Sequence, residues 1–203
     1  MPTSISDLFS NLSLLIQGPV KWSSKIQDDL PGVYVVSVTP NPNEKKNRYG
    51  DVPPIALDLV RNWIAYVPTL KLNGVRPTAN DLKDNLSRFW LADEPILYIG
   101  KTRASLKKRV EQYYKTRLGD SKPHAGGHWL KTLSVLDNLY VYWAITSEPE
   151  HFESDLLKTF VGGISKETLS KIADPVRPFP FANLEYPKGN RKCHKITGSV
   201  NRE

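Results

Sequence analysis

Four side chains of this sequence could together support hydrolysis of a phosphodiester bond. Tyr34 and Tyr98 stand in short β-like segments, within Gly-Val-Tyr and Tyr-Ile-Gly, and Arg109 and Glu153 follow them along the chain. Such a hydrolysis needs a deprotonated water and charge neutralised on the phosphate, which a carboxylate-held Mg²⁺ and an arginine can supply. Glu153 and Arg109 fit those two parts.

One of the two tyrosines could act as the base. A phenol has an unperturbed pKa of roughly 10, so it is a poor base at neutral pH unless a metal or nearby cations favour its ionised form. Lys101, directly after Tyr-Ile-Gly, and Arg109 are placed to do this for Tyr98. The residues leave open which tyrosine takes the proton. We favour Tyr98, with Tyr34 orienting the water or the phosphate.

Two strands are expected to carry these tyrosines. Residues Gly32–Val38 (GVYVVSV) and Ile96–Gly100 (ILYIG) are rich in β-branched and aromatic side chains, a composition typical of buried strands. Residues 39–95 therefore form a long insertion between them. We expect a polar loop there, followed by helices near Ile55–Tyr66 and Thr78–Trp90.

A helix is expected directly after the second strand. Ser105 can cap it and Gly119 can end it. Within this helix, four-residue spacing places Arg109 and Tyr113 on one face. The sequence thus predicts a strand, a short loop and a basic helix in succession.

Glu153 is expected on a later helix. We predict a helix around His128–Leu136 and a strand over Leu139–Thr146. A capping box over Ser147–Glu150 then opens the helix that Gly162 and Gly163 end. Glu153 falls next to the apolar stripe of this helix. A further amphipathic helix is predicted within residues 3–16, and residues 174–203 are Pro-rich, basic and irregular.

Positive charge gathers in two parts of the chain. Lys and Arg number 28 against 21 Asp and Glu, a formal charge of +7, which favours polyanionic partners. The basic stretches over residues 101–117 and 188–195 indicate a phosphate-facing surface rather than merely solvated charges. Side chains expected to contact DNA are Arg103, Lys107, Lys108, His128, Lys188, Arg191 and Lys192, together with Lys45, Lys46 and Arg48 of the insertion.

Composition excludes several classes of protein. The chain has 203 residues, 39% of them hydrophobic and 24% charged, which predicts one folded α+β domain over residues 1–203. Its longest apolar run, Leu139–Ile145, is far shorter than the roughly 20 residues that span a bilayer. One cysteine, Cys193, excludes an intramolecular disulfide framework and a multi-cysteine zinc site. We read no export signal and expect a cytoplasmic protein.

The order and spacing of these elements resemble the GIY-YIG nuclease superfamily. The resemblance covers residues 32–38 and about 96–183, and its specificity comes from five elements taken together. It implies a small antiparallel sheet flanked by helices, with the two motif tyrosines on adjacent strands. Roles implied by the resemblance are Tyr34 and Tyr98 as motif tyrosines, Arg109 as the phosphate-contacting arginine, Glu153 as the ligand of Mg²⁺ or Mn²⁺, and Lys101, Tyr113 and Asn183 as accessory residues.

This sequence departs from the family pattern at two places. The family usually joins its motif strands by a short loop, whereas here residues 39–95 intervene. Such an insertion is tolerable because closure entropy grows slowly with loop length. Val33 also replaces the usual isoleucine, which is conservative on a buried strand.

The resemblance implies a metal-dependent endonuclease acting on double-stranded DNA. A compact chain without an appended DNA-binding module looks most like the stand-alone type II restriction endonucleases of the superfamily. An antiphage or interbacterial DNase with the same chemistry is an alternative, as is a binding protein that keeps the fold without turnover. A palindromic recognition site would favour a homodimer.

Overall fold

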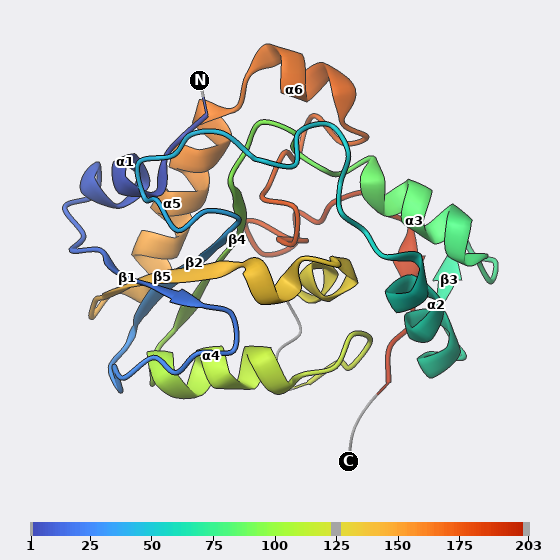
Figure 1. Ribbon diagram of the computed structural model, residues 1–203, viewed down its shortest axis with the longest axis horizontal. Helices are drawn as coiled ribbons and strands as arrows, with labels where there is room; N and C mark the ends of the chain where they lie inside the picture. Colours follow the sequence, from blue (N-terminus) through green and yellow to red (C-terminus); the bar gives the residue numbers. More distant parts are fainter. Residues whose placement is uncertain (1, 123–126, 201–203) are drawn as a thin grey trace.

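A four-stranded antiparallel sheet lies at the centre of the protein (Figure 1). We describe it from a computed structural model in which residues 2–122 and 127–200 are placed. The spatial order is β1 (Gln17–Lys21), β5 (Tyr140–Ile145), β2 (Gly32–Ser37) and β4 (Ile96–Thr102). This arrangement confirms the α+β class, and it leaves β4 at one edge of the sheet.

Helices cover both faces of this sheet (Figure 1). On one face lie α1 (Ile5–Ser10) and α5 (Pro149–Gly163), whose apolar side chains share a core with Val33 and Val35. On the other lies α4 (Leu106–Lys115), which packs with Tyr34. Alternation along β2 thus sends neighbouring side chains into two separate cores.

The insertion forms a small module beside the sheet. It contains α2 (Leu57–Tyr66), β3 (Lys71–Leu72) and α3 (Ala79–Ser87). Strand β3 pairs antiparallel with β6 (Ile196–Thr197) from the C-terminal segment. The prediction of a wholly irregular C-terminal segment is therefore wrong, because residues far away in sequence supply the partner that orders it.

Local capping signals were mostly reliable. The hydroxyl of Thr78 accepts from Asp81 N at 3.2 Å, and the carboxylate of Asp81 accepts from Thr78 N at 3.0 Å, so α3 opens with a capping box. Ser105 likewise accepts from Lys108 N at 3.1 Å and caps α4.

The start of α5 differs from the prediction. No side chain caps it, and Pro149 takes the first helical position. Proline is tolerated there because its missing N–H is one of those that the first turn of a helix leaves without an intrahelical partner. The backbone N–H of Glu148, just before the helix, donates instead to the Thr146 hydroxyl at 3.1 Å.

Other elements also depart from the sequence prediction. The helix expected over residues 128–136 is two short 3₁₀ turns, η1 (His128–Thr132) and η2 (Leu136–Asn138). Helix α1 ends at Ser10, and the following chain turns into β1. The sequence analysis also missed α6 (Lys166–Lys171), which Ser165 caps.

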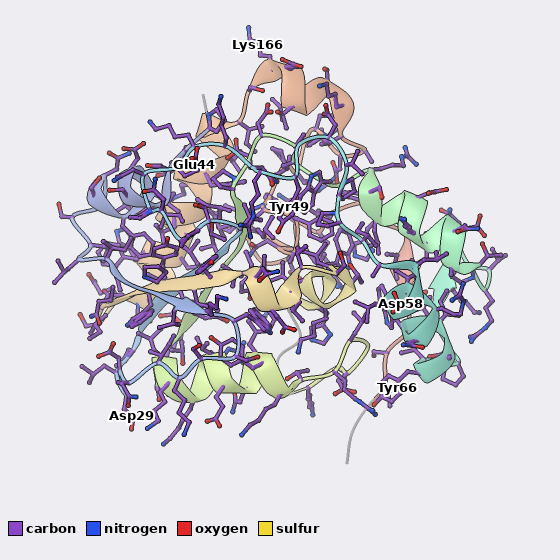
Figure 2. All side chains as sticks on the ribbon, in the orientation of Figure 1. Asp29, Glu44, Tyr49, Asp58, Tyr66 and Lys166 are labelled. Atoms are coloured by element: carbon purple, nitrogen blue, oxygen red, sulfur yellow. The ribbon has the colours of Figure 1, made fainter. Side chains whose placement is uncertain are left out.

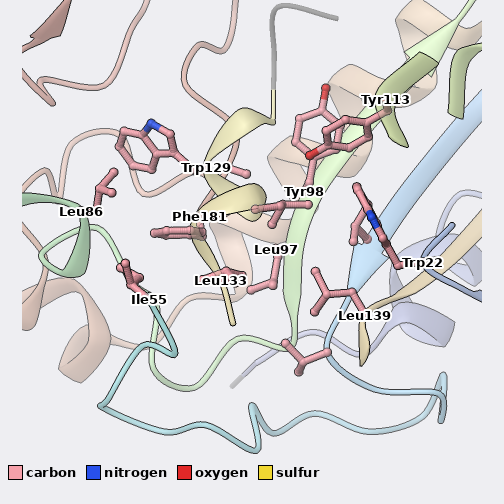
Figure 3. Packing of buried hydrophobic residues seen from close by; sticks show 14 of the residues in the cluster. Trp22, Ile55, Leu86, Leu97, Tyr98, Tyr113, Trp129, Leu133, Leu139 and Phe181 are labelled. Atoms are coloured by element: carbon pink, nitrogen blue, oxygen red, sulfur yellow. The ribbon is translucent and has the colours of Figure 1, made fainter. Parts of the chain in front are cut away.

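The core on the α4 face is rich in aromatic rings (Figure 3). Trp129 lies against Phe181, with ring centroids 5.5 Å apart, and Tyr98 lies against Tyr113. This core joins the sheet to the insertion and to the C-terminal segment. Within the placed residues, no helix has the length and apolar character needed to cross a bilayer.

Candidate functional site

Pairing of β2 with β4 brings the two predicted tyrosines together. The register sets Tyr34 opposite Gly100 and Val36 opposite Tyr98. The two tyrosine rings lie on the α4 face with centroids 5.9 Å apart. A Cβ at Gly100 would come within 2.8 Å of the Tyr34 hydroxyl and 2.6 Å of the Tyr98 ring. Glycine is therefore required at this position for the tyrosines to meet.

Helix α4 adds a third ring to this pair. Tyr113 lies 5.2 Å from Tyr98 and 6.4 Å from Tyr34, measured between ring centroids. Its hydroxyl donates to the carbonyl of Gly127 at 2.6 Å. This hydrogen bond anchors Tyr113 to the backbone, so its position suits a structural support for the other two phenols.

Arg109 faces the tyrosines from the same helix. Burial raises the pKa of Tyr34 well above its ordinary value, and the charge of Tyr98 adds to this, while Arg109 lowers it by its own charge and a hydrogen bond. Burial also raises the pKa of Tyr98 to about 12, with the Glu153 charge adding to it and Arg109 opposing it. In this state both phenols are protonated at neutral pH.

Lys101 does not support Tyr98 as the sequence suggested. Its Nζ lies 2.7 Å from Oε2 of Glu153 on α5. Lys101 follows Ile99 by two residues, so its side chain leaves β4 on the α5 face, away from the face that carries Tyr98. Burial raises the pKa of the Glu153 carboxyl, and the hydrogen bond from Lys101 opposes that shift.

Two pockets meet at Lys101. The first, which we call the basic pocket, has a volume of about 390 Å³ and is formed by the loop after β4 and the first turns of α4. The second, the carboxylate pocket, has a volume of about 300 Å³ and lies beside α5 and the C-terminal segment. The basic pocket is lined by Lys101, Arg103, Lys108, Arg109, Gln112 and Glu150. The carboxylate pocket is lined by Lys101, Glu153, Leu157, Asn183, Glu185, Tyr186 and Lys188.

The sequence analysis did not assign two residues that line the basic pocket. Glu150 forms an ion pair with Arg103, and its charge raises the pKa of Glu153. Gln112 lies three residues after Arg109 on α4. Both sit three positions from a predicted site residue on the same helix, and that spacing was the available signal.

Asn183 lies at the site but is bonded to the backbone. Its amide makes two hydrogen bonds to Ile99, and its side chain is buried. Asn183 also lines the carboxylate pocket. These contacts favour a positioning role, because they hold the strand segment between Tyr98 and Gly100.

Three of the predicted DNA-contacting residues lie beside the two pockets of the site, and two others lie at separate pockets. Arg103 and Lys108 line the basic pocket and Lys188 lines the carboxylate pocket, so all three lie close to Lys101. Lys107 lines a separate pocket with Lys25. Arg191 lies against Glu185 at 3.7 Å, at the edge of another pocket.

Two expected DNA contacts lie in the interior instead. His128 is 7% exposed and Lys192 is 5% exposed. The Lys192 ammonium donates to the carbonyls of Pro180 at 2.8 Å and Phe181 at 3.1 Å. It also lies 5.6 Å from the centre of the Trp129 ring. The structure therefore gives no support to phosphate contacts from Lys192, whose tail segment folds inward, and His128 in η1 is likewise largely buried.

The basic loop of the insertion lies at the opposite end of the hairpin. It leaves β2 beyond Ser37, whereas Lys101 and the basic pocket adjoin the Gly32 end. In Figure 2, Glu44 and Tyr49 mark this loop on the upper side, and Asp29, beside α4, lies on the lower side.

Two of the three predicted cations of this loop contact other parts of the protein, and the third is exposed to solvent away from the site. Lys45 pairs with Asp7 at 2.7 Å, and Arg48 donates to the carbonyl of Asn138 at 3.1 Å. Lys46 is exposed. The structure does not bring these three cations to the tyrosines.

The carboxylate pocket offers a hard divalent cation few protein ligands, so such a cation would be held by one carboxylate and by water. Across residues 2–122 and 127–200, no group of three or more His, Cys, Asp or Glu side chains could hold a metal. Mg²⁺ commonly binds through one or two carboxylates and keeps several waters. Glu153 is half-buried, faces a pocket and already holds a cationic group, so its carboxylate fits this role.

Comparison with known proteins adds no relative. A scan against protein-family models finds no matching family, and searches of the curated proteins and of the solved structures find no match to this chain.

Proposed function

We propose that this protein is a metal-dependent DNA endonuclease with chemistry of the GIY-YIG type. One observation carries the proposal. Two buried tyrosines and Arg109 lie on one face of the hairpin, and the Lys101–Glu153 ion pair lies on the other face of β4, near enough for the Glu153 charge to act on Tyr98. Arg109 lines the basic pocket and its charge acts on both Tyr98 and Glu153, which links the phenol and the carboxylate to a pocket lined by cations.

Each side chain has a part in this proposal. Arg109, with Arg103 and Lys108, binds the phosphate in the basic pocket and neutralises the charge that develops on it. Glu153 holds the divalent cation. Such a cation, when bound, withdraws charge from the phosphate oxygens and makes a nearby water more acidic.

Tyr98 is the better candidate for the base. It is 7% exposed, whereas Tyr34 is fully buried. The charge of Glu153 helps to raise the pKa of Tyr98, so neutralising Glu153 lowers it. Tyr34, hydrogen-bonded to Arg109, then orients the guanidinium and the phosphate.

The finer assignment follows from the resemblance in the sequence. We propose a sequence-specific enzyme of the restriction type, with an antiphage or interbacterial DNase as the alternative setting. A palindromic site would make the working form a homodimer. The single cysteine suits a reducing cytoplasm.

A second candidate is a DNA-binding protein without turnover. It is favoured by the burial of both phenols, which raises their pKa values far from neutral pH. In that case Glu153 and Lys101 would form only a structural ion pair. Binding alone, however, needs no half-buried carboxylate beside a phosphate pocket.

Cleavage of supercoiled plasmid DNA separates the two candidates. The purified chain is incubated with plasmid in Mg²⁺, in Mn²⁺ and in EDTA, and the ends are mapped by sequencing. Metal-dependent cutting is the expected result. Tight DNA binding with no cutting in either metal, across plasmids of different sequence and modification, would establish the binding protein instead.

A further inference from the structure

Lys101 is shared by the two pockets of the site. Its side chain lines both the basic pocket and the carboxylate pocket, and its ammonium is bonded to Glu153 at 2.7 Å. The Lys101 and Glu153 side chains are 33% and 22% exposed, so the pair is accessible to ions from solvent. The Lys101 ammonium thus occupies one of the two oxygens of the carboxylate that would hold a divalent cation.

We propose that Lys101 couples metal binding to DNA binding. In the free protein it holds Glu153, and when a DNA phosphate enters the basic pocket it turns to that phosphate and leaves the carboxylate open. The inference rests on the proposed nuclease function and adds a regulated order of binding to it.

The type of side chain suits this exchange. Lysine carries a point charge on a flexible four-carbon stem with three rotatable donors, so it can move between two oxygen partners. Its neighbour Arg103 is already engaged by Glu150, and Arg109 by Tyr34. Among the cations that line the basic pocket, Lys101 is the lysine paired with Glu153, so it is the one placed to exchange that carboxylate for a phosphate.

Charge determines the direction of the coupling. An ammonium on Glu153 repels a divalent cation and also uses one of its acceptor oxygens. Lys108 and Arg109 attract a phosphate into the basic pocket, and the negative charge of that phosphate then attracts Lys101. Since binding linkage is reciprocal, DNA then raises the affinity for metal, and metal raises the affinity for DNA.

Calorimetry with Ca²⁺ tests the coupling without requiring catalysis. The affinity for Ca²⁺ is measured at pH 8 for the wild type and for Lys101→Met, each alone and with a short mixed-sequence DNA duplex. Lys101→Met should bind Ca²⁺ at least about fivefold more tightly than the wild type without DNA. The duplex should tighten Ca²⁺ binding in the wild type and have little effect in the variant.

Three further variants make the result interpretable. Lys158→Met removes a cation that pairs with Asp155 on the exposed face of α5, the helix that carries Glu153. The Ca²⁺ affinity of this variant should equal that of the wild type. Glu153→Gln should abolish Ca²⁺ binding at this site. Lys101→Gln, a second neutral variant, replaces Lys101→Met if the latter does not fold.

The possible outcomes separate the two proposals. Suppose that the wild type and the folded Lys101 variants bind Ca²⁺ equally well while the wild type cuts plasmid DNA. That result would overturn the coupling, and the proposed nuclease function would still hold. Absence of Ca²⁺ binding with and without the duplex, together with absence of cutting, would overturn both.

Discussion

Asn183 completes the outer edge of β4 by pairing with Ile99. Its Oδ1 accepts from Ile99 N at 2.9 Å and its Nδ2 donates to Ile99 O at 2.8 Å. The backbone N–H of Ala182 also donates to Leu97 O at 2.9 Å. The chain at 182–183 thus replaces a missing neighbour strand, and it supports the strand that carries Tyr98.

The first prediction concerns this contact. Asn183→Ala leaves the buried N–H and C=O of Ile99 without partners, so the free energy of unfolding should fall by about 2–4 kcal/mol in urea denaturation. Asn43→Ala, in an exposed loop, should change stability little. A loss of cleavage in Asn183→Ala at unchanged stability would instead indicate direct contact with the substrate.

Glu153→Gln should abolish cleavage while DNA affinity stays the same or increases. The amide keeps the shape of the side chain but cannot serve as an anionic metal ligand, and a negative charge near the phosphate is removed. Plasmid cutting and a binding titration measure the two effects. Substantial Mg²⁺-dependent cutting by the folded variant would disprove the role of this carboxylate.

Arg109→Ala should slow single-turnover cleavage by about 100-fold or more, as loss of one transition-state donor does elsewhere. Arg61→Ala removes an exposed arginine from α2, away from the site, and should cut at the wild-type rate. If both variants cut equally fast, Arg109 is only a structural partner of Tyr34.

The pH dependence of cleavage should report a phenol. Burial raises the pKa of Tyr98 to about 12, so the ionised fraction, and with it the rate, should rise nearly tenfold per pH unit until the working pKa is reached. Tyr98→Phe should lose the activity while keeping its stability. A flat profile, or activity lost only in Tyr34→Phe, would contradict this assignment.

Substitutions of Lys192 and of Lys188 should have opposite effects: the first should change the pH dependence of stability, and the second should change the affinity for DNA. Burial lowers the pKa of Lys192 to about 7, so between about pH 7 and pH 10 the unfolded chain binds a proton that the folded chain does not. Stability should rise with pH across that window, with this lysine contributing up to about 1.4 kcal/mol per pH unit. Lys192→Met should lose that contribution and keep its DNA affinity.

Lys188→Met provides the matched comparison. Lys188 is exposed and lines the carboxylate pocket, so its loss should weaken DNA binding and reduce the salt slope by about one. Its stability should follow pH as in the wild type. If Lys192→Met weakened DNA binding and Lys188→Met did not, Lys192 would be a DNA-contacting residue after all.

The sequence by itself determined the parts that depend on near neighbours. Strands β2, β4 and β5 follow from β-branched and aromatic runs, and the caps at Thr78 and Ser105 join residues only three positions apart. The pairing of two tyrosine strands and the face shared by Arg109 and Tyr113 follow from the periods of strand and helix.

Only the tertiary structure decided the partners that are distant in the chain. It paired Lys101 with Glu153 rather than with Tyr98, and it turned Asn183 onto the edge of β4. It also buried Lys192, whose basic surroundings suggested a solvent-facing tail. Burial and charge pairing depend on which segments fold against one another, and local periodicity does not contain that information.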